Sequence, residues 1–141
     1  MVENKKEIKK KKASSKGKIL LVEDDDFVSG MYSTKLTMAG YDVAIAVDGK
    51  EGLKMAKQEN PDLILLDIVL PKIDGFQVLE RIKKDQTLKE VPVILLTNLG
   101  QKEDVERGLG LGADDYTIKA HFTPNEVIQK IENLLLKRKK N

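Results

Sequence analysis

Several kinds of residue and segment are missing from this 141-residue sequence, and each absence excludes a class of protein or site. Because there is no cysteine, the chain has neither a disulfide framework nor a thiolate metal site. Its one histidine, His121, has no second histidine to work with, which excludes a histidine-based metal site and favours an exposed loop position. No apolar run reaches the length of a membrane span or has the flanks of a signal peptide, so we expect a cytoplasmic protein without membrane insertion.

The charged residues are distributed unevenly along the chain. The net charge is +2, but residues 1–18 contain eight Lys and two Glu, and the last five residues contain four basic side chains, which leaves an acidic middle. We predict a disordered basic tail over residues 1–17, one domain over 18–138 and a basic tail over 139–141. Such tails could bind nucleic acid or an anionic membrane by counterion release, but we favour a solubilising role, with nucleic acid as the weaker alternative.

The apolar pattern predicts alternating strands and helices. Five short apolar runs are mostly continuous, which is typical of strands buried on both faces: residues 19–22, 43–47, 63–66, 93–96 and 116–118. Helical spacing follows each run, and helix starts are indicated by caps at Asp48, Asp74 and Thr123. The alternation predicts an α/β fold, a doubly wound five-stranded parallel sheet with helices on both faces.

Polar side chains stand where the predicted strands end. Asp67 directly follows the buried run LILL, the acidic run 23–26 follows the first strand, and Thr97 and Lys119 follow the fourth and fifth. In a parallel sheet these positions meet at one edge, where ligands bind. Packed carboxylates raise each other's pKa unless a cation lies among them, and their hard oxygens suit Mg²⁺ or Mn²⁺. Carboxylate, metal, lysine and hydroxyl together indicate a phosphoryl-transfer site.

Each of these residues also has a simpler interpretation when it is considered singly. One of the three aspartates at 24–26 could cap the first helix, Thr97 could be an ordinary strand-end residue, and Lys119 could be a solvated loop lysine. Asp67 is hard to explain in this way, because a carboxylate directly after a buried strand is costly. The four positions together, at successive strand ends, favour the functional interpretation.

The motifs ILLVEDD, DLILLDIVLPKIDG, VPVILLT and LGADDYTIK closely resemble the receiver domain of two-component response regulators, over residues 18–138. The resemblance implies the flavodoxin-like, CheY-like (βα)5 fold. It also implies that Asp67 is the phosphoacceptor, and that Glu23 and Asp24 hold Mg²⁺, or Mn²⁺ in its place, together with Asp67 and the backbone carbonyl of Val69.

The same resemblance gives roles to the remaining strand-end residues and to the protein as a whole. Thr97 would contact the phosphoryl group, Lys119 would bridge to it and, at rest, to Asp67, and Tyr116 would change orientation on activation. The donor would be a sensor histidine kinase or a histidine phosphotransfer protein, with no other small-molecule substrate than a phosphodonor. Such a domain catalyses its own phosphorylation and dephosphorylation and is otherwise no enzyme. Because the sequence stops at Asn141, we expect output through a target protein, a weak homodimer or onward phosphotransfer.

Three features depart from the family pattern. Ala120 follows Lys119 where the family usually has a cis proline, so the Lys119–Ala120 bond is either trans, which moves the lysine, or strained. Asn98 stands where a small residue is common, so the lifetime of the phosphate does not follow from the resemblance. Three glycines, Gly108, Gly110 and Gly112, weaken the fourth helix, which we predict to be short or mobile.

Other functions are less favoured by the residues. A haloacid dehalogenase-like phosphatase needs a second aspartate two positions after the first, where this chain has Val69. Flavodoxin-like nucleotide binding needs a Ser/Thr/Gly phosphate loop after the first strand, where this chain has the acidic run EDDD. A degenerate receiver that serves only as a binding module remains an alternative, although the complete set of five side chains argues against it.

Overall fold

A computed structural model describes residues 15–140, the side chain of Lys140 excepted. Its sheet has the predicted architecture: five strands, all paired in parallel, in the order β2-β1-β3-β4-β5. The strands are β1 (Lys18–Val22), β2 (Asp42–Ala46), β3 (Leu63–Leu66), β4 (Val93–Thr97) and β5 (Asp115–Ile118). The order reverses between β1 and β3, which places their carboxyl ends beside the crevice where this class of fold binds ligands.

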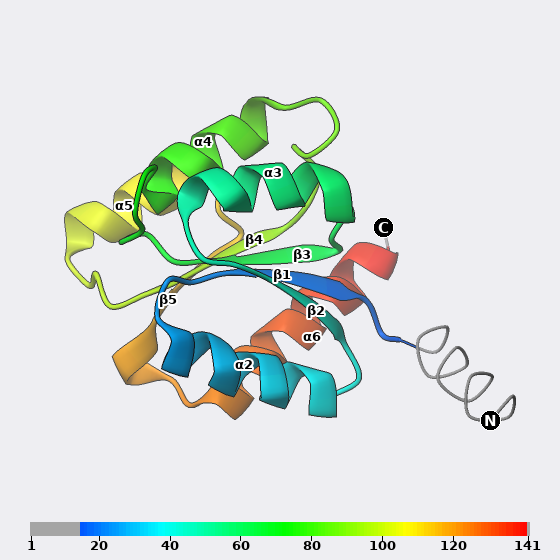
Figure 1. Ribbon diagram of the computed structural model, residues 1–141. Helices are drawn as coiled ribbons and strands as arrows, with labels where there is room; N and C mark the ends of the chain where they lie inside the picture. The colour runs from blue at the N-terminus through cyan, green and yellow to red at the C-terminus, as the bar shows by residue number, and fades with distance from the viewer. Residues whose placement is uncertain (1–14, 141) are drawn as a thin grey trace, which may run out of the picture.

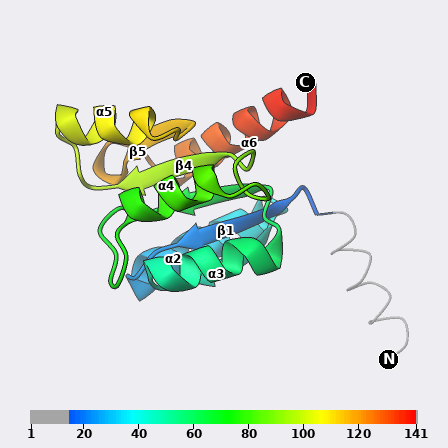
Figure 2. The ribbon, with the colours of Figure 1, turned by 90° about the horizontal axis from the view of Figure 1, so that it is seen from above.

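Helices cover both faces of the sheet, as Figures 1 and 2 show. Helices α3, α4 and α5 lie on one face, and α2 and α6 lie on the other. Their bounds are α2 (Asp26–Met38), α3 (Gly49–Glu59), α4 (Gly75–Lys84), α5 (Lys102–Gly110) and α6 (Pro124–Lys140), with a short 3-10 helix η1 (Lys119–His121) after β5. Among these described helices none is both long enough and apolar enough to cross a bilayer.

The continuous apolar runs of the strands are explained by two cores, one on each face. Successive side chains of a strand point to opposite faces, so Leu20 and Val22 of β1 enter the core under α3 and α4, whereas Ile19 and Leu21 enter the core under α2 and α6. All four residues of β3 are fully buried. The carboxylate that follows β3 therefore extends from the most apolar strand of the protein.

The helix starts use the predicted caps. Asp48 accepts a hydrogen bond from the N–H of Glu51, Asp74 forms a capping box with Gln77, and Thr123 exchanges hydrogen bonds with Glu126. Of the three aspartates at 24–26, Asp25 caps α2, since its side chain accepts from the N–H of Val28 at 3.0 Å. A cap of this kind stabilises a helix by about 1 kcal/mol.

Helix α5 is short, with nine residues, but its glycines do different things. Gly108 is buried, and a Cβ atom there would lie 2.5 Å from Cδ1 of Leu95 and 2.9 Å from the ring of Tyr116. Gly110 has open space around it, and Gly112 has a φ of +105° just after the helix. Gly108 therefore allows α5 to approach the sheet closely, a packing role that its helix propensity alone did not indicate.

The two segments predicted to be basic tails are only partly described. Residues 1–14 and Asn141 lie outside the described residues. Residues 15–17 are held by hydrogen bonds, among them one from the N–H of Lys16 to the carbonyl of Gly40 at 2.9 Å. Helix α6 continues to Lys140, so Lys139 and Lys140 belong to it.

We expect the substitution Gly75→Ala to destabilise the protein, because a Cβ atom there would lie 2.2 Å from the carbonyl oxygen of Asp67 and 2.6 Å from Cα of Ile68. Both are backbone atoms that cannot rotate away, so we expect a loss of about 1–3 kcal/mol of the free energy of unfolding. Gly30→Ala, in open space inside α2, is the matched control and should gain up to about 1 kcal/mol. Chemical denaturation measures both, and equal effects would contradict the packing argument.

Candidate functional site

Asp67 lies at the carboxyl end of β3, and the sheet fixes its backbone. Its N–H donates to the carbonyl of Val22 in β1 at 3.0 Å. Its side chain is only 9% exposed, and Oδ1 accepts from the N–H groups of Ile68 at 2.6 Å and Val69 at 3.3 Å. Backbone donors thus solvate one carboxylate oxygen in place of water.

Lys119 reaches the other oxygen of this carboxylate. It follows β5, and its Nζ donates to Oδ2 of Asp67 at 2.9 Å and also to Oε1 of Glu23. Residues 15–140 contain no cis peptide bond, so the Lys119–Ala120 bond is trans, and η1 begins at Lys119. The lysine therefore contacts Asp67 without the cis proline that the family pattern would supply.

Glu23 and Lys119 form a pair that burial alone would disfavour. Glu23 is 2% exposed, and burial raises the pKa of its carboxyl group. The hydrogen bond from Lys119 lowers this pKa in part, whereas the negative charge of Asp67 raises it further. Burial by itself would lower the pKa of Lys119, but the hydrogen bonds to Glu23 and Asp67 outweigh it and raise that pKa. The ammonium group is therefore held charged between two carboxylates.

Glu23, Asp24 and Asp67 each offer a carboxylate oxygen within 4.8 Å of the other two. Three hard oxygen donors this close together suit Mg²⁺ or Mn²⁺, and Asp24 is exposed, so an ion could enter from solvent with its own waters. Asp25 does not join this cluster because its side chain caps α2. The residues present thus fit a divalent cation, whereas a role for the carbonyl of Val69 stays a prediction.

Thr97 is the last residue of β4 and is fully buried. It lies beside Ile118 in the β4–β5 register, one residue before Lys119, so the sheet places Thr97 and Lys119 at the same edge. Its Oγ1 accepts from the N–H of Leu99 at 3.3 Å, and the hydroxyl keeps its own proton to donate. Asn98, next in the chain, is exposed.

Tyr116 is connected to Thr97 through Leu99. The Tyr116 hydroxyl donates to the carbonyl of Leu99 at 2.7 Å. Leu99 in turn donates through its N–H to Thr97, so it is hydrogen-bonded to both side chains. Burial, assisted by the charges of Asp104 and Asp67, raises the pKa of Tyr116 to about 12. The tyrosine ring also lies against Gly108 of α5, which puts this chain of contacts next to a surface helix.

Three parts of this site were not predicted from the sequence. They are the hydrogen bond of Lys119 to Glu23, the position of Leu99 between Thr97 and Tyr116, and the approach of Gly75 to the backbone of Asp67. The dipeptide Asp74-Gly75 could have indicated the last of these, since a glycine after a helix cap suggests close packing. No sequence motif indicates the Lys119–Glu23 hydrogen bond or the position of Leu99, because both depend on where the fold places the backbone and side chains.

Comparisons with known proteins agree with this geometry. Residues 19–132 match the family model of the response regulator receiver domain. The chain is 46% identical over 118 residues to the DNA-binding dual master transcriptional regulator RpaA of Synechocystis; the match covers 84% of this chain but 48% of RpaA, so the chain spans about half of that relative.

Solved structures of receiver domains are similar over nearly their whole length. A CheY-like receiver domain protein of Methanospirillum hungatei has a TM-score of 0.81 at 32% identity, covering 87% of this chain and 96% of the other. The Mn²⁺-bound form of response regulator Rcp1 has a TM-score of 0.73 at 34% identity, covering 82% and 91%. Together with the strand order and the acidic cluster, these matches show that the chain belongs to the response regulator receiver domain family.

Proposed function

We propose that this protein is a phosphorylation switch in which Asp67 accepts a phosphoryl group from a histidine kinase or a histidine phosphotransfer protein. One observation carries the proposal: Asp67 shares a cluster within 4.8 Å with Glu23 and Asp24, and the same carboxylate is paired with Lys119. Membership of the receiver family supports a histidine kinase as the partner. A receiver of this kind accepts the group and catalyses its own turnover, with no other substrate.

The transfer follows from the chemistry of these groups. An oxygen of the Asp67 carboxylate attacks phosphorus, a P–O bond forms, and the P–N bond to the donor histidine breaks. The histidine nitrogen leaves with the electron pair of that bond and takes up a proton. Lys119 and the hydroxyl of Thr97 neutralise or donate to the phosphoryl oxygens, and a divalent cation held by Glu23, Asp24 and Asp67 would neutralise further negative charge. Attack of water on the acyl phosphate later releases phosphate and restores the carboxylate.

The signal leaves the site through Thr97, Leu99 and Tyr116. The Thr97 hydroxyl donates its free proton to a phosphoryl oxygen, which draws the side chain toward the site and weakens the hydrogen bond that its Oγ1 accepts from the N–H of Leu99. Leu99 also holds the Tyr116 hydroxyl, and Tyr116 packs against α5 at Gly108. A shift of these groups changes the surface around α5, and a target protein binds the altered population.

RpaA is a DNA-binding transcriptional regulator, but this chain corresponds to about half of it, so we assign only the receiver step here. We propose that the switch works in the cytoplasm, where ATP-dependent kinases supply phosphohistidine. The alternative of a degenerate, unphosphorylated binding module is less favoured, because the geometry brings every group that the chemistry needs to one edge of the sheet.

We predict that incubation with acetyl phosphate and Mg²⁺ adds the mass of one phosphoryl group, and that Asp67→Asn abolishes this adduct because an amide cannot act as the nucleophile. Asp26→Asn, an exposed residue outside the carboxylate cluster, should be phosphorylated like the wild type. Intact mass spectrometry measures both. A wild-type protein that gains no mass would support the degenerate module instead.

We predict that Mg²⁺ stabilises the wild type against unfolding, by about 2.7 kcal/mol at a hundred times the dissociation constant. Asp24→Asn should lose most of this gain, because it removes the exposed carboxylate of the cluster, while Asp26→Asn should keep it. Thermal unfolding with and without Mg²⁺ measures the difference. If Asp24→Asn responds as strongly as Asp26→Asn does, the carboxylate cluster is not the metal site.

We predict that Tyr116 makes the protein less stable at high pH. Its pKa is raised to about 12 in the folded chain, against an ordinary value of 10.0, so the unfolded chain loses this proton first and stability falls as pH rises from 10 to 12. Tyr116→Phe should show a shallower fall. Denaturation curves across this range give the slope, which is the relevant readout because the variant also loses the hydrogen bond to Leu99. Parallel curves for the two proteins would contradict the assignment.

A further inference from the structure

The segment that carries Lys119 is held by few backbone contacts of its own. β5 is the last strand at one edge of the sheet, so it is paired on one side only, with β4. The three-residue helix η1 follows it without a side-chain cap, and its closing hydrogen bond, from the N–H of Phe122 to the carbonyl of Lys119, is long at 3.5 Å. Ala120 and His121 are exposed. The position of the Lys119 main chain therefore depends on contacts made by other side chains.

Phe122 packs the end of this turn against the protein interior. Its side chain is half-buried and lies against the core under α2 and α6. The Nζ atom of Lys130, in the second turn of α6, lies 4.2 Å from the centre of the Phe122 ring. An ammonium group at this distance is attracted by the partial negative charge of the aromatic face. Lys130 thus covers the ring that ends the turn after Lys119.

Lys130 is itself held by Asp115, the first residue of β5. Its Nζ donates to Oδ2 of Asp115 at 2.9 Å, and the two side chains are 26% and 35% exposed. Oδ1 of Asp115 accepts from the N–H of Tyr116 at 2.7 Å, which fixes the direction of the carboxylate. One ammonium group therefore connects the start of β5 to the residue that follows η1, and Lys119 lies between these two points. We call Asp115, Phe122 and Lys130 the β5 clamp.

We propose that the β5 clamp positions Lys119 for phosphoryl transfer. The inference rests on the proposed phosphorylation of Asp67, and it makes Lys130 a positioning residue that acts through Lys119. The Lys119 ammonium group has to stay within hydrogen-bond distance of Asp67 while the phosphoryl group arrives, and a flexible β5–η1 segment would let it move away. The clamp restricts that motion at both ends of the segment.

The clamp contributes little to the stability of the fold as a whole. An ion pair between partly exposed side chains is weak, and so is a cation–π contact at such a site. Removing the charge of Lys130 also leaves the apolar core under α2 and α6 intact. A change in the phosphorylation rate of a chain that stays folded throughout the assay therefore reports on the position of Lys119.

The test is the rate at which the full chain gains a phosphoryl group from acetyl phosphate and Mg²⁺, followed by intact mass spectrometry. Lys130→Met keeps the apolar stem of the side chain but has no charge for Asp115 or the ring, and we expect phosphorylation to be about three- to tenfold slower. Asp115→Asn, which can still accept from the N–H of Tyr116, should be slower as well. Lys130→Arg should keep the wild-type rate, because a guanidinium group pairs with a carboxylate and stacks on an aromatic ring.

Lys119→Gln separates an effect through Lys119 from an effect on the rest of the site. If Lys130 acts only by positioning Lys119, Lys130→Met slows the wild type but has no further effect in a chain that already carries Lys119→Gln. Long incubations make the slow rate of that chain measurable. Equal slowing by Lys130→Met in both backgrounds would overturn the proposal.

A second measurement needs neither Mg²⁺ nor a phosphodonor, so it tests the clamp even if Asp67 accepts no phosphoryl group. Nuclear magnetic resonance follows the exchange of the Lys119 ammonium protons with water, which is slowed by the hydrogen bonds to Glu23 and Asp67. We expect faster exchange in Lys130→Met and wild-type exchange in Lys130→Arg. Unchanged exchange in Lys130→Met would overturn the proposal, as would an unchanged rate of phosphorylation. A wild type that is never phosphorylated would contradict the proposed function, while faster exchange in Lys130→Met would still show that the clamp holds Lys119.

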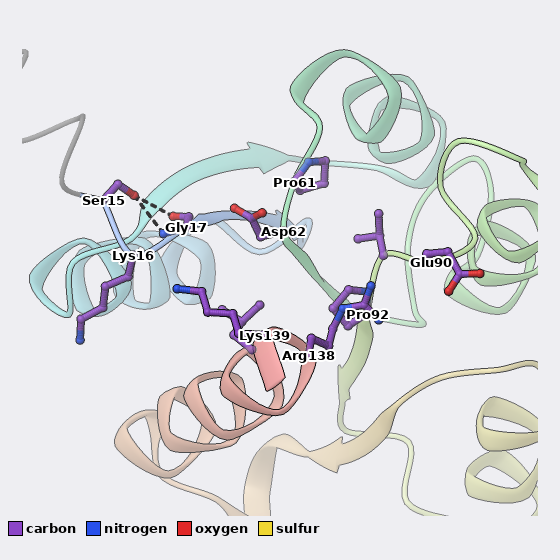
Figure 3. Close-up of a pocket in the computed structure, with 11 residues that line it drawn as sticks. Ser15, Lys16, Gly17, Pro61, Asp62, Glu90, Pro92, Arg138 and Lys139 are labelled. Carbon is purple, nitrogen blue, oxygen red and sulfur yellow. Dashed lines mark hydrogen bonds between the residues drawn. The ribbon is translucent and has the colours of Figure 1, made fainter. Parts of the chain in front are cut away.

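Lys18→Met is the matched control. The Lys18 side chain pairs with Glu59 at 2.8 Å and is 35% exposed, much like Lys130, but it lies at the opposite edge of the sheet. Figure 3 shows the preceding residue, Gly17, at the hollow of about 480 Å³ that lies at that edge. The control should match the wild type in phosphorylation rate and in ammonium exchange. Equal effects of Lys18→Met and Lys130→Met would show that the loss of any such ion pair is responsible and would overturn the proposal. Circular dichroism verifies that every variant is folded.

Discussion

The site depends on one cation held between two carboxylates. Glu23 and Asp67 are almost fully buried, and two like charges about 4 Å apart repel by roughly 4 kcal/mol at an effective dielectric near 20. Lys119 offsets this repulsion by donating to both. Under the proposed function the same arrangement would make the site responsive, because a divalent ion would compete for the carboxylates and a phosphoryl group would compete for the lysine. Stability at rest and reactivity on phosphorylation would then come from the same contact.

Close backbone packing sets the positions of these groups. Gly75 allows α4 to start against the backbone of Asp67, and Gly108 allows α5 to lie against Leu95 and Tyr116. Between them, Leu99 connects the strand-end threonine to the tyrosine by one hydrogen bond on each side. Under the proposed function, a small movement at the carboxylate would reach a surface helix through these contacts, because closely packed side chains shift together and do not deform smoothly.

The parallel sheet also gives the molecule two chemically different ends. Every strand ends at the acidic edge, where helix N-termini favour negative groups, and α6 ends at the opposite edge, where its basic last turn is compatible with the helix dipole. The topology therefore brings acidic residues from several strand ends to one edge of the sheet. Under the proposed function, the carboxyl end of the sheet would carry the phosphoryl chemistry.

The order of residues was enough to predict the sheet, the caps and the strand-end side chains that lie together at the carboxyl edge, because burial on both faces requires continuous apolar runs and a carboxylate after such a run is conspicuous. It left open which of the three aspartates at 24–26 caps α2, since adjacent residues of one type differ only in backbone direction, and it assigned Asp24 to the metal only through the family resemblance. Three features emerged only when the chain was folded: Lys119 contacts Glu23 although the Lys119–Ala120 bond is trans, Gly108 is a packing residue, and Lys16 reaches Glu132 of α6. These are contacts between residues far apart in sequence, and their distances are fixed by the packing of whole elements rather than by any local pattern.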